Sequence, residues 1–434
     1  MKCPYACDSF DHVHGRRAFL QRITAAGLSF GGVSAATGLA GLMSDTPVLA
    51  EQLKSRHKRV LNVFLHGGVS QLESWDPKPN TNTGGPFRAI STSVPGIHIS
   101  ELLPHTAQQM HHLSIIRSLN TKNNDHGRGQ AEMTTGHKQI PGSNYPHLGA
   151  VAARLLTPED FTLPGHILIR GAGSSSGKAA YLGPKFESVV MNDGKPPQYT
   201  ERPSGLTAEA DQRRNELRAR FSDRFAARRR TADTDAYTFS YDQAQSLLAQ
   251  RDVFDASREP AADQQRYGTS EFGEHCLLAR RLLEHGVPFV QINHSNYDTH
   301  YENFDFHIEQ LGEFDLPFAT LISDLAERGL LQDTLICVMS EFGRTPKINT
   351  RYGRDHWGTA WSVVLGGTGI QPGGVIGMTN ENGTAVVERQ VDHGHLFHTI
   401  LQAVGVQSAG EFEIGGRTYP IADPSKGPIE ELLA

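Results

Sequence analysis

The chain has 434 residues, of which 38% are hydrophobic and 20% are charged, and its formal net charge is −6 at pH 7. This composition is typical of a soluble globular protein, and the length requires one large core or a core with an inserted lobe. The mild negative charge argues against a nucleic-acid-binding protein, which would carry a basic face to neutralise phosphates.

The first fifty residues have the pattern of an export signal. "GRRAFLQ" (15–21) places Arg16 and Arg17 before an uncharged run, 23–44, that is rich in Gly, Ala, Ser and Thr. "TPVLA" then forms a small-residue cleavage signal that ends at Ala50. This order predicts a twin-arginine signal peptide over 1–50 and a mature protein, 51–434, that is periplasmic or secreted. An uncut N-terminal membrane anchor is the alternative.

Strand and helix patterns alternate along the mature chain. Strands are predicted over 59–68, 113–119, 166–172, 287–294, 333–340 and 361–367. Helices are predicted over 99–110, 127–135, 147–156, 272–286 and 305–329, with a last one after Asp392. Near-continuous apolar strands separated by helices predict an α/β fold with a mostly parallel sheet covered on both faces. Cys276 and Cys337 fall inside these patterns, which favours buried thiols over a disulfide framework or a cysteine zinc site.

Residues 205–268 differ from the rest of the chain. "RRNELRARFSDRFAARRR" (213–230) holds eight arginines and an apolar stripe at Leu217, Phe221 and Phe225. Such a run is typical of the solvated face of a helical insertion lobe. The alternative is a basic helix that grips an acidic polymer.

Imidazoles, carboxylates and guanidiniums follow four of the predicted strands. They are His66 after the first, His126 and Arg128 after the second, Asp298 and His300 after strand 287–294, and Glu341, Arg344 and His356 after strand 333–340. Ligands in open α/β sheets bind beyond the carboxyl ends of the strands. Neutral imidazoles and ionised carboxylates are the donors that a metal such as zinc requires. The pattern therefore predicts a metal site, although each residue alone is also typical of a hydrogen-bonding loop.

Several motifs carry a family resemblance. They are "FLHGGVSQLESWDPKP", "TTGHKQIPG", "NYDTHYENF", "SEFGRTPKIN", "GRDHWG" and "LGGTGIQPGGVIG". Together they resemble the exported bacterial family called domain of unknown function 1501, which in turn resembles the alkaline phosphatase superfamily with its sulfatases and phosphoglycerate mutases. The resemblance implies an alkaline-phosphatase-like three-layer sandwich. It also implies one or two divalent metals in a site that cleaves phosphate or sulfate esters.

Matching this chain to the superfamily by position implies a ligand set. It comprises His66, Asp298, His300, Glu341 and His356. A mixture of histidine and carboxylate ligands favours zinc or manganese, with calcium and magnesium left open. Arg128 and Arg344 would hold the tetrahedral oxyanion, because guanidinium forks suit that shape. Alternatively, each arginine pairs with a neighbouring carboxylate as a structural buttress.

The chain also departs from the superfamily. The position of the nucleophile is occupied by His126, and the sulfatase signature of Cys or Ser followed by x-Pro-x-Arg is absent. The step from Asp298 to His300 is two residues where the superfamily usually has four, and Phe342 replaces a histidine. His126 is therefore read first as a metal ligand with metal-activated water as the nucleophile, second as a filler of a degenerate site, and third as a covalent nucleophile.

We therefore expect an exported metal-dependent hydrolase of phosphate or sulfate esters. Its substrate would be a small anionic ester or a sulfated or phosphorylated glycan, with no nucleic acid and no stable membrane insertion after signal cleavage. The alternative is a catalytically silent exported protein that binds or assembles on the same scaffold. Trp75 in "SWDPKP" is expected to pack inside the protein rather than to stack on a sugar.

Overall fold

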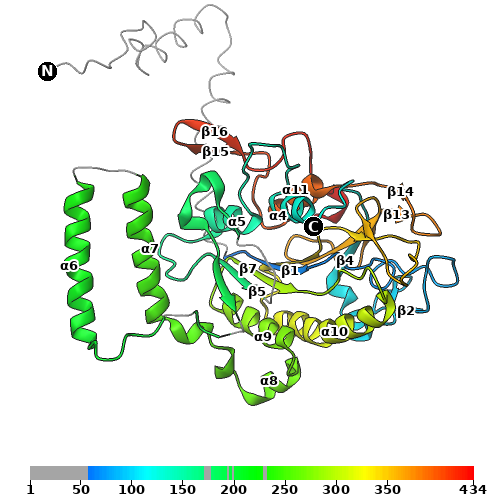
Figure 1. Ribbon diagram of the computed structural model, residues 1–434, viewed down its shortest axis with the longest axis horizontal. Helices are drawn as coiled ribbons and strands as arrows, with labels where there is room; N and C mark the ends of the chain where they lie inside the picture. The colour runs from blue at the N-terminus through cyan, green and yellow to red at the C-terminus, as the bar shows by residue number, and fades with distance from the viewer. Residues whose placement is uncertain (1–56, 171–176, 193–194, 198–199, 228–231) are drawn as a thin grey trace, which may run out of the picture. The chain divides into compact units, whose positions relative to one another are not determined.

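A computed structural model describes residues 57–170, 177–192, 195–197, 200–227 and 232–434 (Figure 1). The predicted signal peptide lies outside these residues and stays a prediction. Every helix in the described ranges is too short or too polar to cross a membrane.

An eight-stranded sheet forms the centre of the protein, with the strand order β12-β4-β11-β8-β1-β7-β5-β6. In chain order the strands are β1 (Arg59–Leu65), β4 (Leu113–Leu119), β5 (His166–Arg170), β6 (Val189–Asn192), β7 (Phe289–His294), β8 (Thr334–Met339), β11 (Trp361–Gly367) and β12 (Val375–Ile376). Seven of them run in one direction, whereas β11 is antiparallel to both of its neighbours, β4 and β8. The predicted mostly parallel sheet is confirmed.

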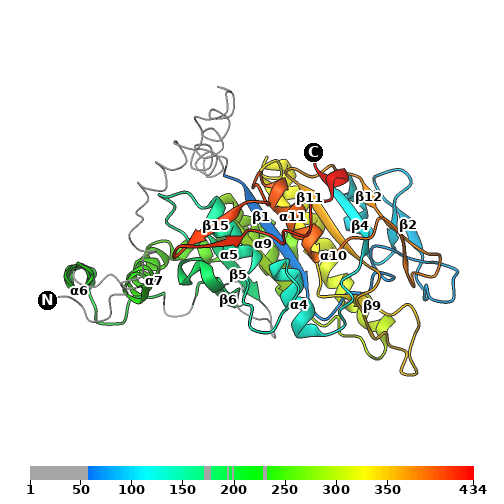
Figure 2. The same cartoon turned by 90° about the horizontal axis from the view of Figure 1, so that it is seen from above.

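Both faces of the sheet are apolar and covered by helices. Along β1, Leu61, Val63 and Leu65 belong to one buried cluster and Val60 and Phe64 to the other, as the alternation of a strand requires. The first cluster packs on α3 (Pro104–Gln108), α9 (Glu271–Glu284) and α10 (Asn303–Glu327). The second packs on α4 (His126–Thr135), α5 (Leu148–Leu156) and α11 (His393–Ala403). Figures 1 and 2 show the resulting three layers of helix, sheet and helix.

The remaining strands and the 3-10 turns are short. The strands form four two-stranded ladders: β2 (Ala89–Ser91) with β3 (His98–Ser100), β9 (Gly343–Arg344) with β10 (His356–Trp357), β13 (Met378–Thr379) with β14 (Val386–Glu388) and β15 (Glu411–Ile414) with β16 (Arg417–Pro420). The 3-10 turns are η2 (Met110–His112), η3 (Ala180–Leu182), η4 (Pro184–Phe186), η5 (Arg251–Phe254), η6 (Ala256–Arg258) and η7 (Glu430–Leu432). The helix predicted over 99–110 is wrong in its first half. Ile99 pairs with Ile90 in the β2–β3 ladder, and the helix begins only at Pro104, because proline suits the first turn of a helix and not its interior.

The arginine-rich segment forms a helical hairpin of α6 (Ala208–Ala226) and α7 (Ala232–Ala249), followed by α8 (Ala261–Tyr267). Arg218 joins the two long helices: its Nη2 lies 3.1 Å from Asp242 Oδ1, and its guanidinium carbon lies 4.5 Å from the ring centre of Tyr241. The expected buried thiols are confirmed, since Cys276 and Cys337 are both fully buried. Trp75 is also buried, and its ring packs edge-on against Phe314.

Candidate metal centre

Polar side chains gather at the edge of the sheet where its parallel strands end. His66 follows β1, Asp298 follows β7 and Glu341 follows β8. Because β11 runs the other way, its first residue lies at this same edge, and His356 precedes that residue by only five positions. The single reversed strand therefore adds a histidine from late in the chain to groups that follow parallel strands.

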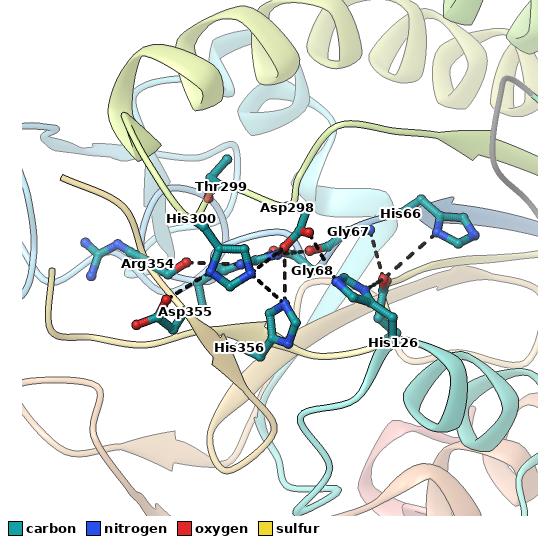
Figure 3. Close-up of polar contacts among 12 residues, drawn as sticks. His66, Gly67, Gly68, His126, Asp298, Thr299, His300, Arg354, Asp355 and His356 are labelled. Carbon is teal, nitrogen blue, oxygen red and sulfur yellow. Dashed lines mark hydrogen bonds and ion pairs between the residues drawn. The ribbon is translucent and has the colours of Figure 1, made fainter. Parts of the chain in front are cut away.

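Asp298, His300 and His356 present donor atoms to one another at short range. The Nε2 atoms of His300 and His356 are 3.0 Å apart, and both lie close to Oδ1 of Asp298, at 3.1 and 3.2 Å. Figure 3 shows the two imidazoles converging on the aspartate. Ligand atoms about 2.0–2.1 Å from a tetrahedral ion are separated by roughly 3.3 Å. The observed spacing thus fits a cation between the three.

The outer nitrogen of each imidazole fixes its tautomer. Nδ1 of His300 lies 2.9 Å from Oδ1 of Asp355, and Nδ1 of His356 lies 2.8 Å from the carbonyl oxygen of Asn124. Both partners accept only, so each neutral ring carries its proton on Nδ1 and turns the lone pair of Nε2 inward. With both rings in this tautomer, two nitrogen lone pairs and a carboxylate oxygen face each other. Such an arrangement is stabilised by a cation, and outer partners of this kind commonly orient metal-binding histidines.

His126 joins the cluster from the first residue of α4. Its Nδ1 lies 2.8 Å from Oε1 of Glu341, and its Nε2 lies 3.4 Å from Oδ2 of Asp298. Hydrogen bonds with Asp298 and Glu341 raise the pKa of His126 to about 9. Its donor atom, that of Asp298 and that of His356 all lie within 4.8 Å of one another. His126 can therefore supply a further ligand if Nε2 gives up its proton.

Glu341 lies behind His126 and not among the converging donors. Its side chain is fully buried, and it accepts hydrogen bonds from the backbone N–H of Gly67 (2.9 Å) and from the hydroxyl of Ser340 (3.0 Å) as well as from His126. Burial alone would raise the pKa of Glu341, but the hydrogen bond from His126 and the nearby His66 lower it below its ordinary value. Glu341 is therefore a buried carboxylate that orients His126.

His66, expected as a ligand, lies apart from the cluster (Figure 3). Its Nδ1 is 3.9 Å from Oε1 of Glu341, and its Nε2 is 3.1 Å from the amide nitrogen of Gln130. Burial lowers the pKa of His66. The structure thus brings Asp298, His300 and His356 together with His126 and leaves His66 on the far side of Glu341.

The two arginines differ from the expected anion clamps. Arg344 is fully buried and donates to Oδ1 of Asp298 (2.6 Å) and to the carbonyl oxygens of Gly67, Gly68 (2.9 Å) and Arg354 (3.0 Å). This geometry argues against the clamp role and agrees with the buttress alternative, because the buried fork already donates four hydrogen bonds within the protein. Burial would raise the pKa of Asp298, but hydrogen bonds with His126, His356 and Arg344 hold it well below its usual range.

Arg128 is exposed, and its backbone N–H is capped by the side chain of Asp125. It lies two positions after His126 on α4, so the two side chains leave the helix about 200° apart. Gly129 and Gln130 occupy the positions three and four residues after His126, which share its face. Gly129 is packed so closely that an added Cβ would lie 2.8 Å from the carbonyl oxygen of Glu341.

A buried ion pair lies beneath the cluster. Arg354 donates to both carboxylate oxygens of Glu73, at 2.7 and 3.0 Å, and both side chains are fully buried. The carbonyl oxygen of Arg354 in turn accepts from Arg344, which holds Asp298. The cluster itself is open, with 46% of the Asp298 side chain exposed. The donor cluster is thus accessible to solvent, and the buried ion pair of Glu73 and Arg354 supports it from beneath.

The family model described as a protein of unknown function (DUF1501) matches residues 57–433. The chain belongs to the DUF1501 family. The predicted family is thereby confirmed. None of the curated proteins matches the sequence of this DUF1501 protein.

Solved structures with a similar fold include the PsFucS1 sulfatase from Pseudoalteromonas sp., at 14% identity and a TM-score of 0.39, covering 84% of this chain and 72% of that one. A protein in the alkaline phosphatase superfamily from Vibrio parahaemolyticus matches at 10% identity and a TM-score of 0.36, covering 83% and 76%. A mutant of the TAB5 alkaline phosphatase with Mg bound matches at 12% identity and a TM-score of 0.37, covering 80% and 98%. At this distance the chemistry of the DUF1501 protein is decided by its own residues.

Sequence reasoning missed the groups that orient the donors. Asp355 and the carbonyl oxygen of Asn124 fix the two tautomers, and Gln130 contacts His66. Gln130 follows His126 by four positions, so helical spacing could have placed it on the same face. The carbonyl of Asn124 carries no signal in a sequence, because every residue has one.

Proposed function

We propose that this DUF1501 protein is a metal-dependent hydrolase of phosphate or sulfate esters. The observation that carries the proposal is the convergence of three potential metal ligands on one point. These are Oδ1 of Asp298 and the Nε2 atoms of His300 and His356, all within 3.2 Å of one another. The reaction class comes from the resemblance of the sequence motifs to the alkaline phosphatase superfamily.

The donor set suits a single divalent cation. Asp298, His300 and His356 would hold it, with Nε2 of His126 as a further ligand. Two or three imidazoles with one carboxylate favour zinc or manganese over calcium, which prefers oxygen ligands. When bound, such a cation polarises an ester oxygen and lowers the pKa of a coordinated water, in zinc enzymes to about 7.

The protein itself supplies order and charge. Asp355 and the Asn124 carbonyl keep the two imidazoles turned inward, and Glu341 does the same for His126. Arg344 fixes the carboxylate of Asp298 from the buried side. Because Arg128 leaves α4 about 200° from His126, we assign the anionic group of the substrate to the bound cation and not to this arginine. That substrate would be a small ester or a sulfated or phosphorylated glycan.

Metal binding and turnover test the proposal on the purified mature chain. We expect divalent metal in the protein, a lower melting temperature after chelation, and hydrolysis of an aryl phosphate or sulfate ester. His356→Ala should remove both metal and activity, because it deletes one of the converging donors. His285→Ala is the matched control, since His285 is exposed at the end of α9 and bonds only to its own helix. If the purified protein contains no metal and a chelator leaves its melting temperature unchanged, the proposal is wrong.

A catalytically silent binding protein is the second candidate. It is favoured by His126, an imidazole at the position where the superfamily has a hydroxyl or thiol nucleophile. A screen of aryl phosphates and sulfates with several divalent metals separates the two. Turnover that is lost in Glu341→Ala and kept in His285→Ala would exclude the silent scaffold.

We also propose export through the twin-arginine route, on the sequence of residues 1–50 alone. Replacing Arg16 and Arg17 with lysine should leave the precursor in the cytoplasm. Cell fractionation followed by immunoblotting measures this. Export that is unchanged in the double variant would contradict the assignment.

A further inference from the structure

The helix α6 exposes a row of large apolar side chains. Leu217, Phe221 and Phe225 are 49%, 67% and 54% exposed. They are four positions apart, so they lie on one face of the helix. Exposed apolar side chains that line up in this way mark an interaction surface more often than scattered ones do.

Arginines border this row, and acidic residues are kept away from it. At 100° per residue, an arc of about 140° around the row contains Arg213, Arg214, Leu217, Arg220, Phe221, Arg224 and Phe225 together with Ala210. The acidic residues of α6 all fall outside the arc; they are Glu209, Asp211, Glu216 and Asp223. The face is therefore both apolar and cationic, although the helix as a whole is nearly neutral.

The part of α6 that packs on α7 lies at one edge of this face. Arg218 contacts Asp242 and Tyr241 of α7, and the side chain of Arg218 is only 16% exposed. Arg218 lies about 60° beyond the centre of the apolar row. In Figure 1 the hairpin of α6 and α7 stands with α6 as its outer helix. Among the described residues, α7 thus covers the edge of the face without covering its centre.

We infer that this face of α6 is a peripheral docking surface for a lipid bilayer that contains anionic lipids. Apolar side chains flanked by arginines match the boundary of acyl chains and negatively charged head groups, where arginine can extend its charge toward the phosphates. The inference is independent of the proposed catalytic activity.

Two other occupants fit the face less well. A second copy of the chain would bring arginines against arginines. An acidic glycan would satisfy the arginines, but stacking on sugars suits Tyr and Trp, which carry a polar group, whereas this row is built from Phe and Leu. The bilayer is the occupant that uses both features of the face.

Vesicle cosedimentation of the full mature chain tests the inference. We expect binding to vesicles of phosphatidylcholine with about 30% phosphatidylglycerol and none to pure phosphatidylcholine, because each arginine near an anionic surface contributes attraction. Raising the salt from about 0.05 M to about 0.5 M should release the protein, since the Debye length shrinks severalfold.

Paired substitutions distinguish vesicle binding through the α6 face from binding through the net charge of the protein. Arg214→Gln with Arg224→Gln should weaken binding about thirtyfold, roughly fivefold for each arginine. Phe221→Ser with Phe225→Ser should also weaken it, although the net charge is unchanged. Arg88→Gln with Arg417→Gln is the matched control, because it removes the same charge from exposed positions outside α6.

The outcomes are decisive in either direction. Equal losses in the face variant and in the control would overturn the inference, as would the absence of binding to anionic vesicles. Binding that ignores the phenylalanine substitutions but is displaced by a sulfated polysaccharide would replace the bilayer with an acidic polymer. Circular dichroism of each variant checks that the helices remain folded.

Discussion

The buried pair of Glu73 and Arg354 should contribute strongly to stability. At about 4 Å between charge centres and an effective dielectric constant of about 20, their attraction is about 4 kcal/mol. Glu73→Gln removes the charge but keeps an oxygen that accepts one hydrogen bond, which retains about 1 kcal/mol. We therefore expect Glu73→Gln to lower the free energy of unfolding by about 3 kcal/mol, in line with other buried pairs that lose one partner.

Urea unfolding in the presence of a chelator measures this loss without a contribution from metal. The matched control is Glu431→Gln. Glu431 makes the same two-pronged contact with Arg389, at 2.6 and 2.9 Å, but about half of the Glu431 side chain is exposed. Exposed pairs contribute about 1 kcal/mol or less. If the two variants lose the same stability, burial is not what gives the Glu73 pair its strength, and the reasoning fails.

Three further predictions concern the centre and the core. Asp355→Ala should weaken zinc binding about 10–100-fold in titration calorimetry, since His300 loses the acceptor that fixes its tautomer; an unchanged affinity would contradict this. Gly129→Ala should also weaken zinc binding, because its Cβ would press α4 away from Glu341, whereas in the control Gly127→Ala the nearest atom lies 3.6 Å away; equal effects would refute the packing argument. Burial lowers the pKa of His166 to about 4. Because the unfolded chain binds this proton near pH 6.5, the stability that the neutral imidazole contributes is complete above pH 6.5 and falls by about 3 kcal/mol as the pH drops to 4. Urea midpoints across this range should show a shallower slope for His166→Gln than for the native chain.

The strands of the sheet could be predicted from the sequence where they are buried on both faces. Arg59–Leu65 and Trp361–Gly367 are nearly continuous apolar runs, which only a covered central strand tolerates. The direction of the second of these was not readable, because a buried strand has the same composition in either direction. Short ladders such as β2–β3 were missed for a different reason. They lie at the surface, where three-residue strands leave no periodic pattern.

The sequence predicts the donor residues of the candidate site but not the groups that hold them in place. That His126, Asp298, His300 and His356 lie together was predictable, because they follow strands that end at one edge of the sheet. Arg344 looked equally available, yet its partners are mostly carbonyl oxygens, which the sequence cannot distinguish. Whether a guanidinium faces solvent or the interior depends on the path of the backbone around it.

The strand order has a consequence during translation. β1 is among the first parts of the sheet to leave the ribosome, but its two neighbours, β7 and β8, are made much later. At roughly 5–20 residues per second, the interval between Leu65 and Met339 is on the order of 15–55 s. Throughout this interval an apolar strand has both of its edges unpaired, and we expect it to be prone to aggregation until β7 and β8 are made. The four side chains of the candidate cluster are all present only after His356 has emerged.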